Sequence, residues 1–134
     1  MIKVETSVKA PLDKVWEYWS NPEHITKWCQ ASDDWHAPHA ENDLQNGGRF
    51  KTVMSAKDGS FSFDFEGVYH DVDKPDYIRY TLDDGRKVEI IFKAQGDHTK
   101  ITESFEAEKT NSEVVQKAGW QAILDSFKKY TENN

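Results

Sequence analysis

Glu103 is the residue whose chemistry fits its sequence position least well. Strand-like alternation places it on the same face as Ile101 and Phe105, which are apolar and expected to be buried. Because an unpaired buried carboxylate is costly, Glu103 would bind a ligand's polar end or act as an acid or base with a raised pKa. The alternative is a bulge or an edge position that turns Glu103 to solvent.

Two histidines, His36 and His39, lie among acidic residues with the spacing H-x-x-H. Imidazoles and carboxylates are ligands for divalent cations, so a metal site is one interpretation. Pro38 separates the histidines, and spacing alone does not fix a coordination geometry. We predict a solvated acidic segment over residues 29–46 that binds no metal. A run this long without an element is typically a lid, a binding loop or a missed element.

Cys29 is the only cysteine, so an internal disulfide is excluded. It could act as a nucleophile with His24 or His36 as its base. The alternative is a thiol that fills the core beside Trp28. Serine nucleophile elbows, phosphate-binding glycine loops and dinucleotide fingerprints are absent. We therefore predict no catalytic residues and no cofactor.

Composition limits the classes of function. The 134 residues carry 17 Lys and Arg against 24 Asp and Glu, a formal charge of −7, with no basic cluster for nucleic acid. Hydrophobic residues make up 37% of the chain, enough for the core of one domain over residues 1–134. No apolar window is long enough to insert into a membrane, and no apolar leader opens the chain. We expect a cytoplasmic protein.

The longest predicted helix spans residues 110–131. At about 100° per residue its apolar side chains form a wide arc, and Thr110 and Glu113 have the spacing of a capping box. Gly119, Ala122 and Ser126 lie within about 60° of one another on this helix. These small residues either leave room for a ligand or allow close packing against a sheet.

Alternating residues predict a strand over residues 2–8 and five consecutive strands between residues 50 and 105. Two short helices, over residues 11–21 and 22–28, follow the first strand, each with a proline at its start. The predicted order is β-α-α-β5-α. This order indicates an α+β fold in which a curved antiparallel sheet surrounds the C-terminal helix.

Several motifs resemble a known superfamily. The run from Val8 to Trp28, V-K-A-P-x-x-x-V-W-x-x-x-x-N-P-E-H-I-x-x-W, resembles the opening of the START-like, helix-grip superfamily often called SRPBCC. The motifs G-G-R-F at residues 47–50, F-E-G-V-Y at 65–69 and the pair Gly119-Trp120 resemble the branch related to the activator of the ninety-kilodalton heat-shock protein's ATPase. The resemblance implies a stand-alone helix-grip domain with a deep cavity between sheet and helix, which relatives use for lipids, sterols and polyketides.

We therefore expect a non-enzymatic domain that binds a small hydrophobic or amphipathic molecule, such as a lipid-like, polyketide-like or flavonoid-like compound. The expected ligand-binding residues, with the two tryptophans near the entrance, are Trp28, Trp35, Phe63, Phe65, Tyr80, Phe92, Ile101, Glu103, Gly119 and Ile123. The second hypothesis is a chaperone-associated stress-response regulator that contacts its partner through the outer sheet face. The third is a cyclase or hydrolase that uses Glu103 or a histidine.

Overall fold

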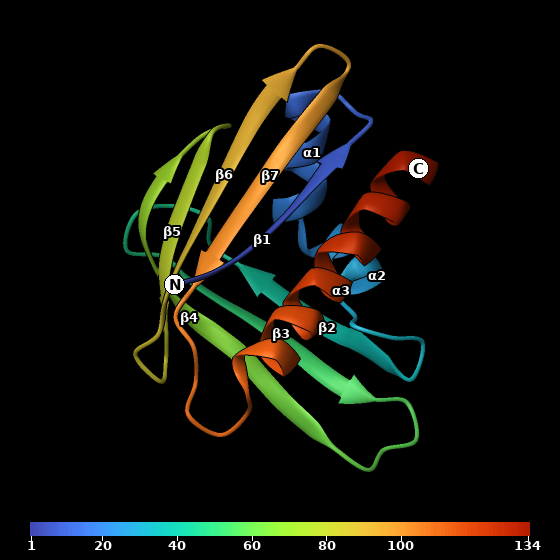
Figure 1. Cartoon of the computed structure of the whole chain (residues 1–134), viewed down its shortest axis with the longest axis vertical. Helices are drawn as coiled ribbons and strands as arrows, with labels where there is room; N and C mark the ends of the chain where they lie inside the picture. Colours follow the sequence, from blue (N-terminus) through green and yellow to red (C-terminus); the bar gives the residue numbers. More distant parts are fainter.

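The computed structural model describes all 134 residues, and their strands form one antiparallel sheet in the order β1-β7-β6-β5-β4-β3-β2 (Figure 1). The elements are β1 (Ile2–Val8), α1 (Leu12–Ser20), α2 (Pro22–Trp28), β2 (Trp35–Asn42), β3 (Arg49–Ala56), β4 (Ser62–Asp73), β5 (Tyr77–Leu82), β6 (Lys87–Gln95), β7 (His98–Phe105) and α3 (Glu113–Asn133). The predicted α+β helix-grip architecture is confirmed. None of the helices is both long enough and apolar enough to cross a bilayer.

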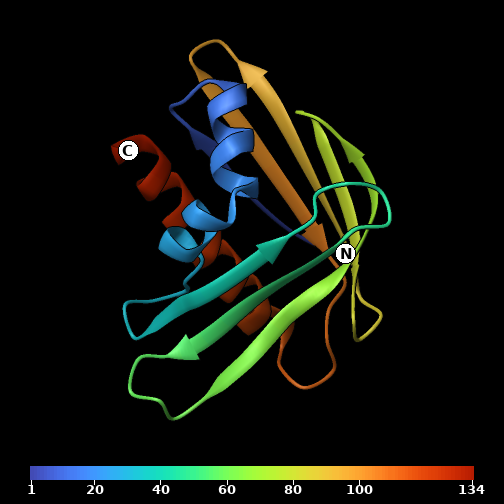
Figure 2. The same cartoon turned by 180° about the vertical axis from the view of Figure 1, so that it is seen from behind.

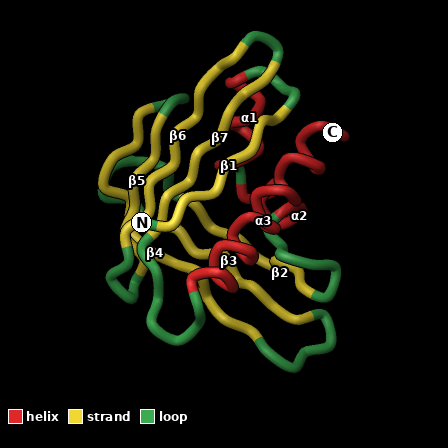
Figure 3. Tube along the Cα trace, in the orientation of Figure 1, coloured by secondary structure: helices red, strands yellow, loops and turns green.

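The sheet is strongly coiled. Strands β1, β7 and β6 run steeply through the molecule, while β2, β3 and β4 turn away from them and pass beneath the helices (Figures 1 and 2). All three helices lie on the same side of the strands (Figure 3). Helix α3 packs along β1 and against α1 and α2. It is therefore held mainly by one half of the sheet.

The core follows the period of two that strands impose. On β7, Ile101, Glu103 and Phe105 are buried, whereas the residues between them are partly exposed. Leu124 and Phe127 of α3 are fully buried against this face. Each such side chain contributes about 1.5–3 kcal/mol through the area it removes from water.

Helix α3 begins two residues later than a Thr110–Glu113 capping box requires. Its N-cap is Ser112, whose Oγ accepts a hydrogen bond from the backbone N–H of Val115 at 3.2 Å. The predicted capping box is therefore wrong. The cause is Gln116, whose buried side chain fixes the preceding loop: its Oε1 accepts from Glu108 N at 2.8 Å and its Nε2 donates to Asn111 O at 2.8 Å.

The predicted number of strands is also wrong, because six strands rather than five lie between α2 and α3. The additional strand, β2, lies inside the segment predicted as a loop over residues 29–46. Its pairing with β3 shifts register between His36 and His39, so Pro38 lies at a bulge on an edge strand. A proline is tolerated there because its missing N–H removes no ladder bond. The same bulge interrupts the alternation by which a strand is recognised.

Candidate functional site

A cavity of about 410 Å³ lies between α3 and the part of the sheet that turns away from it. This volume is within the range of about 300–1,000 Å³ that small-molecule sites occupy. Sixteen of its 25 lining residues are hydrophobic, so the wall suits an apolar ligand. The cavity exists because α3 packs along β1 and leaves the diverging strands uncovered.

Aromatic rings form the sheet side of the cavity. Phe50 packs edge to face on Tyr80, with ring centroids 4.7 Å apart, and also contacts Tyr69 at 5.1 Å. From α3, Trp120 meets Phe65 at 5.9 Å. Because each ring is supported by another, the wall has a defined shape.

Glu103 contributes the buried carboxyl group of this wall. The residue is only 6% exposed, and β7 pairs in unbroken register with Val4 of β1 on one side and Ile90 of β6 on the other. The alternative of a bulge or an edge position is therefore wrong. Burial raises the pKa of the Glu103 carboxyl to about 8, and its side chain forms no hydrogen bond or ion pair with the protein.

Cys29 and Tyr80 line the same cavity as Glu103. Burial, reinforced by the Glu103 charge, raises the pKa of the Cys29 thiol to about 12 and raises that of Tyr80 well above its ordinary value. Both groups are therefore neutral at physiological pH. The Cys29 Sγ lies 3.5 Å from the Met54 Sδ, which leaves the thiol in a sulfur-rich core environment.

No histidine lines the cavity, which argues against the cysteine nucleophile considered from the sequence. His24 is engaged elsewhere, because its Nδ1 lies 2.7 Å from the Tyr130 hydroxyl and its ring stacks on Tyr18. His39 is 3.7 Å from Glu41. The structure contains no group of three or more His, Cys, Asp or Glu side chains arranged to hold a metal ion.

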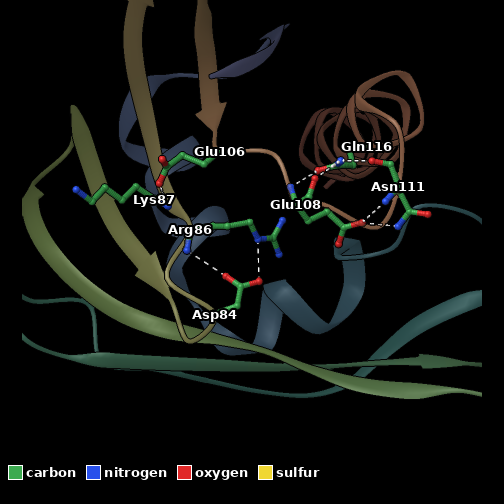
Figure 4. Close-up of polar contacts among 7 residues, drawn as sticks. All are labelled: Asp84, Arg86, Lys87, Glu106, Glu108, Asn111 and Gln116. Atoms are coloured by element: carbon green, nitrogen blue, oxygen red, sulfur yellow. Dashed lines mark hydrogen bonds and ion pairs between the residues drawn. The ribbon is translucent and has the colours of Figure 1, made fainter.

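A polar rim, formed by Arg86, Glu108, Asn111 and Gln116, borders one side of the cavity. Arg86 extends from the β5–β6 turn toward the loop that carries Glu108, and its Nε donates to Asp84 at 2.8 Å (Figure 4). Glu108 accepts from the backbone N–H of Asn111 at 3.0 Å. The charges of this rim are therefore satisfied locally.

Two exposed apolar side chains, those of Phe63 and Val115, also border the cavity and are called the apolar rim. Phe63 is 43% exposed and Val115 is 58% exposed, although both line the cavity. Trp35 packs against Phe63 with ring centroids 6.0 Å apart. The cavity thus reaches the surface between two hydrophobic side chains.

The structure places eight of the ten predicted ligand-binding residues in the cavity wall and two elsewhere. The eight are Trp28, Trp35, Phe63, Phe65, Tyr80, Glu103, Gly119 and Ile123. Phe92 and Ile101 are wrongly assigned, because they are neighbours on β6 and β7 and are fully buried where α1 covers the sheet. Trp28 is wrongly placed at the entrance: it is 4% exposed and packs on Trp19 and Phe127.

On α3, only Gly119 of the three small residues lines the cavity. A Cβ added there would meet no atom within 4 Å, so the space beside it is open. Ser126 instead supports close packing, because its Oγ donates to the Trp28 carbonyl at 2.7 Å. Of the three small residues, only Gly119 leaves open space beside the helix on the cavity side.

Sequence reasoning missed several lining residues, among them Phe50, Tyr69, Trp120 and Arg86. Phe50 alternates with Thr52 and Met54 on a single face of β3, and all three line the cavity. That alternation could have identified all three as residues of the inner sheet face. Arg86 follows a hairpin turn, where no periodic pattern indicates the direction of a side chain.

Comparison with known proteins identifies one family. The sequence model for proteins described as "Activator of Hsp90 ATPase homolog 1-like protein" matches residues 9–132. The match confirms the resemblance that the motifs indicate. A comparison with functionally curated proteins finds no significant match.

Solved structures of similar proteins share the fold. The solution structure of the AHSA1-like protein from Aeromonas hydrophila is 40% identical, with a TM-score of 0.90 over 98% of this chain and 93% of that one. Chr148 from Cytophaga hutchinsonii is 60% identical, with a TM-score of 0.85 over 99% of this chain and 92% of that one. CV1439 from Chromobacterium violaceum has a TM-score of 0.88 over 99% of this chain and 98% of that one, but at 20% identity it supports the fold alone.

Proposed function

Since this chain belongs to the family of Activator of Hsp90 ATPase homolog 1-like proteins, we propose that it uses the helix-grip cavity to bind a small hydrophobic or amphipathic molecule. One observation carries the proposal: a cavity of about 410 Å³ with a mainly apolar wall also holds the buried, unpartnered carboxyl of Glu103. A lipid-like, polyketide-like or flavonoid-like compound has the required combination of apolar body and polar group.

The wall supplies most of the binding free energy. Each 100 Å² of apolar ligand surface taken from water contributes about 2.5 kcal/mol, from which the cost of immobilising the ligand is subtracted. The polar group adds orientation, because it would meet Glu103 inside the cavity. The apolar end would then point toward the apolar rim of Phe63 and Val115.

The test measures thermal unfolding with and without a library of fatty alcohols, fatty acids, sterols, polyketides and flavonoids. A ligand of the native state should raise the Tm, and its addition should perturb the NMR signals of Gly119 and Ile123. If no compound raises the Tm or perturbs these signals, the proposal fails.

Gly119→Leu provides the matched variant. Its side chain would extend into the open space beside Gly119, so ligand affinity should fall by about tenfold or more while the protein stays folded. Lys117→Leu adds the same side chain on the exposed face of α3 and should leave affinity unchanged. Equal affinities for both variants would place the ligand outside the cavity.

The family description supports a second candidate function, a chaperone-associated stress-response regulator. Its partner would contact the outer sheet face, where Arg49 pairs with Asp83 at 3.0 Å and Lys51 with Asp64 at 3.5 Å. Purified heat-shock ATPase should then turn over faster in the presence of this protein, and Arg49→Glu should reduce the effect. An unchanged ATPase rate together with no detectable complex would rule this function out.

A further inference from the structure

Given the proposed cavity function, on which this inference rests, we infer that the preferred ligand is a hydrophobic amine whose ammonium group pairs with Glu103. The occupant would be a cationic amphiphile rather than a fatty acid. The inference follows from the charges that line the cavity, from the unpartnered carboxyl, and from the aromatic rings around it.

The ionisable side chains of the wall favour a cation. Three carboxyl groups line the cavity, and Arg86 is its only cationic residue. Glu108 accepts from Asn111 and Glu41 lies 3.7 Å from His39, so Glu103 is the carboxyl group without a partner. The Arg86 guanidinium is already engaged by Asp84 at 2.8 Å. An anionic headgroup would thus meet an engaged arginine at the polar rim and a carboxyl group inside.

The Glu103 carboxyl borders the cavity and has no partner from the chain. More than nine in ten buried polar groups in proteins have a hydrogen-bond partner, yet the Glu103 carboxyl has none within the chain. An ammonium group is the strongest partner for a carboxylate, since both are charged and it can donate several hydrogen bonds. The rings of Phe50, Tyr69 and Tyr80 add cation–π attraction on the same wall.

None of the other groups around Glu103 provides a positive charge to pair with its carboxylate. Val4 and Ile90, its neighbours on β1 and β6, are apolar, and Tyr80 from β5 is neutral at physiological pH. Cys29, which follows α2, is likewise a neutral thiol. Helix α3 contributes no ionisable side chain to the wall, its lining residues being Val115, Gln116, Gly119, Trp120 and Ile123.

A pH dependence follows from this geometry. Burial raises the pKa of the Glu103 carboxyl to about 8, so at about pH 6 the group is mostly protonated and must lose a proton to pair with an amine. Alkylammonium groups stay charged up to about pH 10, as lysine does. Amine affinity should therefore rise from about pH 6 and level off near pH 9.

The experiment compares decylamine, decanol and decanoate, which share a chain and differ in headgroup. Binding is followed by calorimetry and by the fluorescence of the cavity tryptophans at about pH 6 and about pH 9. We expect decylamine to bind at least about tenfold tighter than decanol at about pH 9. The affinity for decylamine should also rise at least about tenfold from about pH 6 to about pH 9. Decanoate should bind most weakly.

Two variants that each replace one glutamate by glutamine distinguish the effect of the buried Glu103 carboxyl from the effect of the protein's net charge. Glu103→Gln should abolish the preference for decylamine over decanol, together with its pH dependence, while decanol still binds. Glu5→Gln removes an exposed carboxylate that lies 3.5 Å from Lys100 and should preserve both properties.

The outcomes distinguish this inference from the function on which it rests. If decanol or decanoate binds as tightly as decylamine at about pH 9, the amine preference is refuted and the cavity function survives. The amine inference is also refuted if Glu103→Gln still prefers decylamine over decanol, or if the affinity for decylamine does not change with pH. If none of the three compounds binds, both proposals fall.

Discussion

At one end of the concave sheet face, which we call the closed end, Phe92 packs edge to face on Trp16 and Trp19 with centroids 5.5 and 5.6 Å apart. Trp19 in turn contacts Phe127 at 4.9 Å. At the open end, formed by Phe63, Phe65, Val115 and Gly119, the same face borders a cavity. Both ends carry aromatic residues. They differ in what covers them, because α1 and the C-terminal half of α3 fill the closed end.

The difference separates stability from binding within one fold. At the closed end, Trp16, Phe92 and Phe127 are buried among protein atoms and gain nearly the full transfer and packing energy, while Trp19 lies at the boundary with the cavity. At the open end, part of the apolar surface is not covered by protein atoms and can be buried by a ligand. Substitutions at the two ends should therefore affect different measurements.

The largest expected effect is at the closed end. Phe127→Ala should lower the free energy of unfolding by about 3–5 kcal/mol, because the ring is fully buried and its loss leaves a void. Phe65→Ala should cost markedly less, since that ring is only partly buried and already borders a cavity. Urea denaturation of both variants measures the difference. Equal losses would contradict the distinction between the two ends.

The next effect belongs to Glu103, whose pKa is about 8 in the folded state against 4.5 unfolded. At Glu103 the folded state then binds more protons than the unfolded state, so the contribution of this residue to stability is highest below about pH 4.5 and falls until about pH 8. At about 1.4 kcal/mol per pH unit between these two pKa values, the loss approaches roughly 5 kcal/mol. Unfolding measured across this range should show the decline relative to Glu103→Gln. Parallel curves for the two proteins would mean that Glu103 is solvated.

The smallest expected change in the free energy of unfolding is at Gly119, at the open end. Gly119→Ala should raise the free energy of unfolding by about 0.5–1 kcal/mol, because alanine favours the helix and its Cβ enters open space. Ala118→Gly, on the exposed side of α3, should lower it by a similar amount. Thermal denaturation measures both. A destabilised Gly119→Ala would mean that the space beside α3 is filled.

Much of the fold could be predicted because most strands keep an unbroken period of two. Glu103 was found in this way, since alternation assigns each side chain to a face. Alternation does not say which part of that face a helix covers, and Phe92 and Ile101 were assigned to the cavity for that reason. The polar rim could not be predicted either, because hydrogen bonds between the Gln116 side chain and the loop backbone set the conformation of that loop, and such bonds leave no periodic pattern in the sequence.

The bulge at Pro38 has a consequence for association between molecules. Exposed edge strands are templates on which another chain can add a strand and begin to aggregate. On β2 the bulge and the proline interrupt this template. On β1, the opposite edge, Gln121 and Lys128 of α3 donate to the carbonyls of Glu5 and Ser7 at 3.1 and 2.7 Å. Both borders of the sheet are thus protected against recruiting a neighbouring chain.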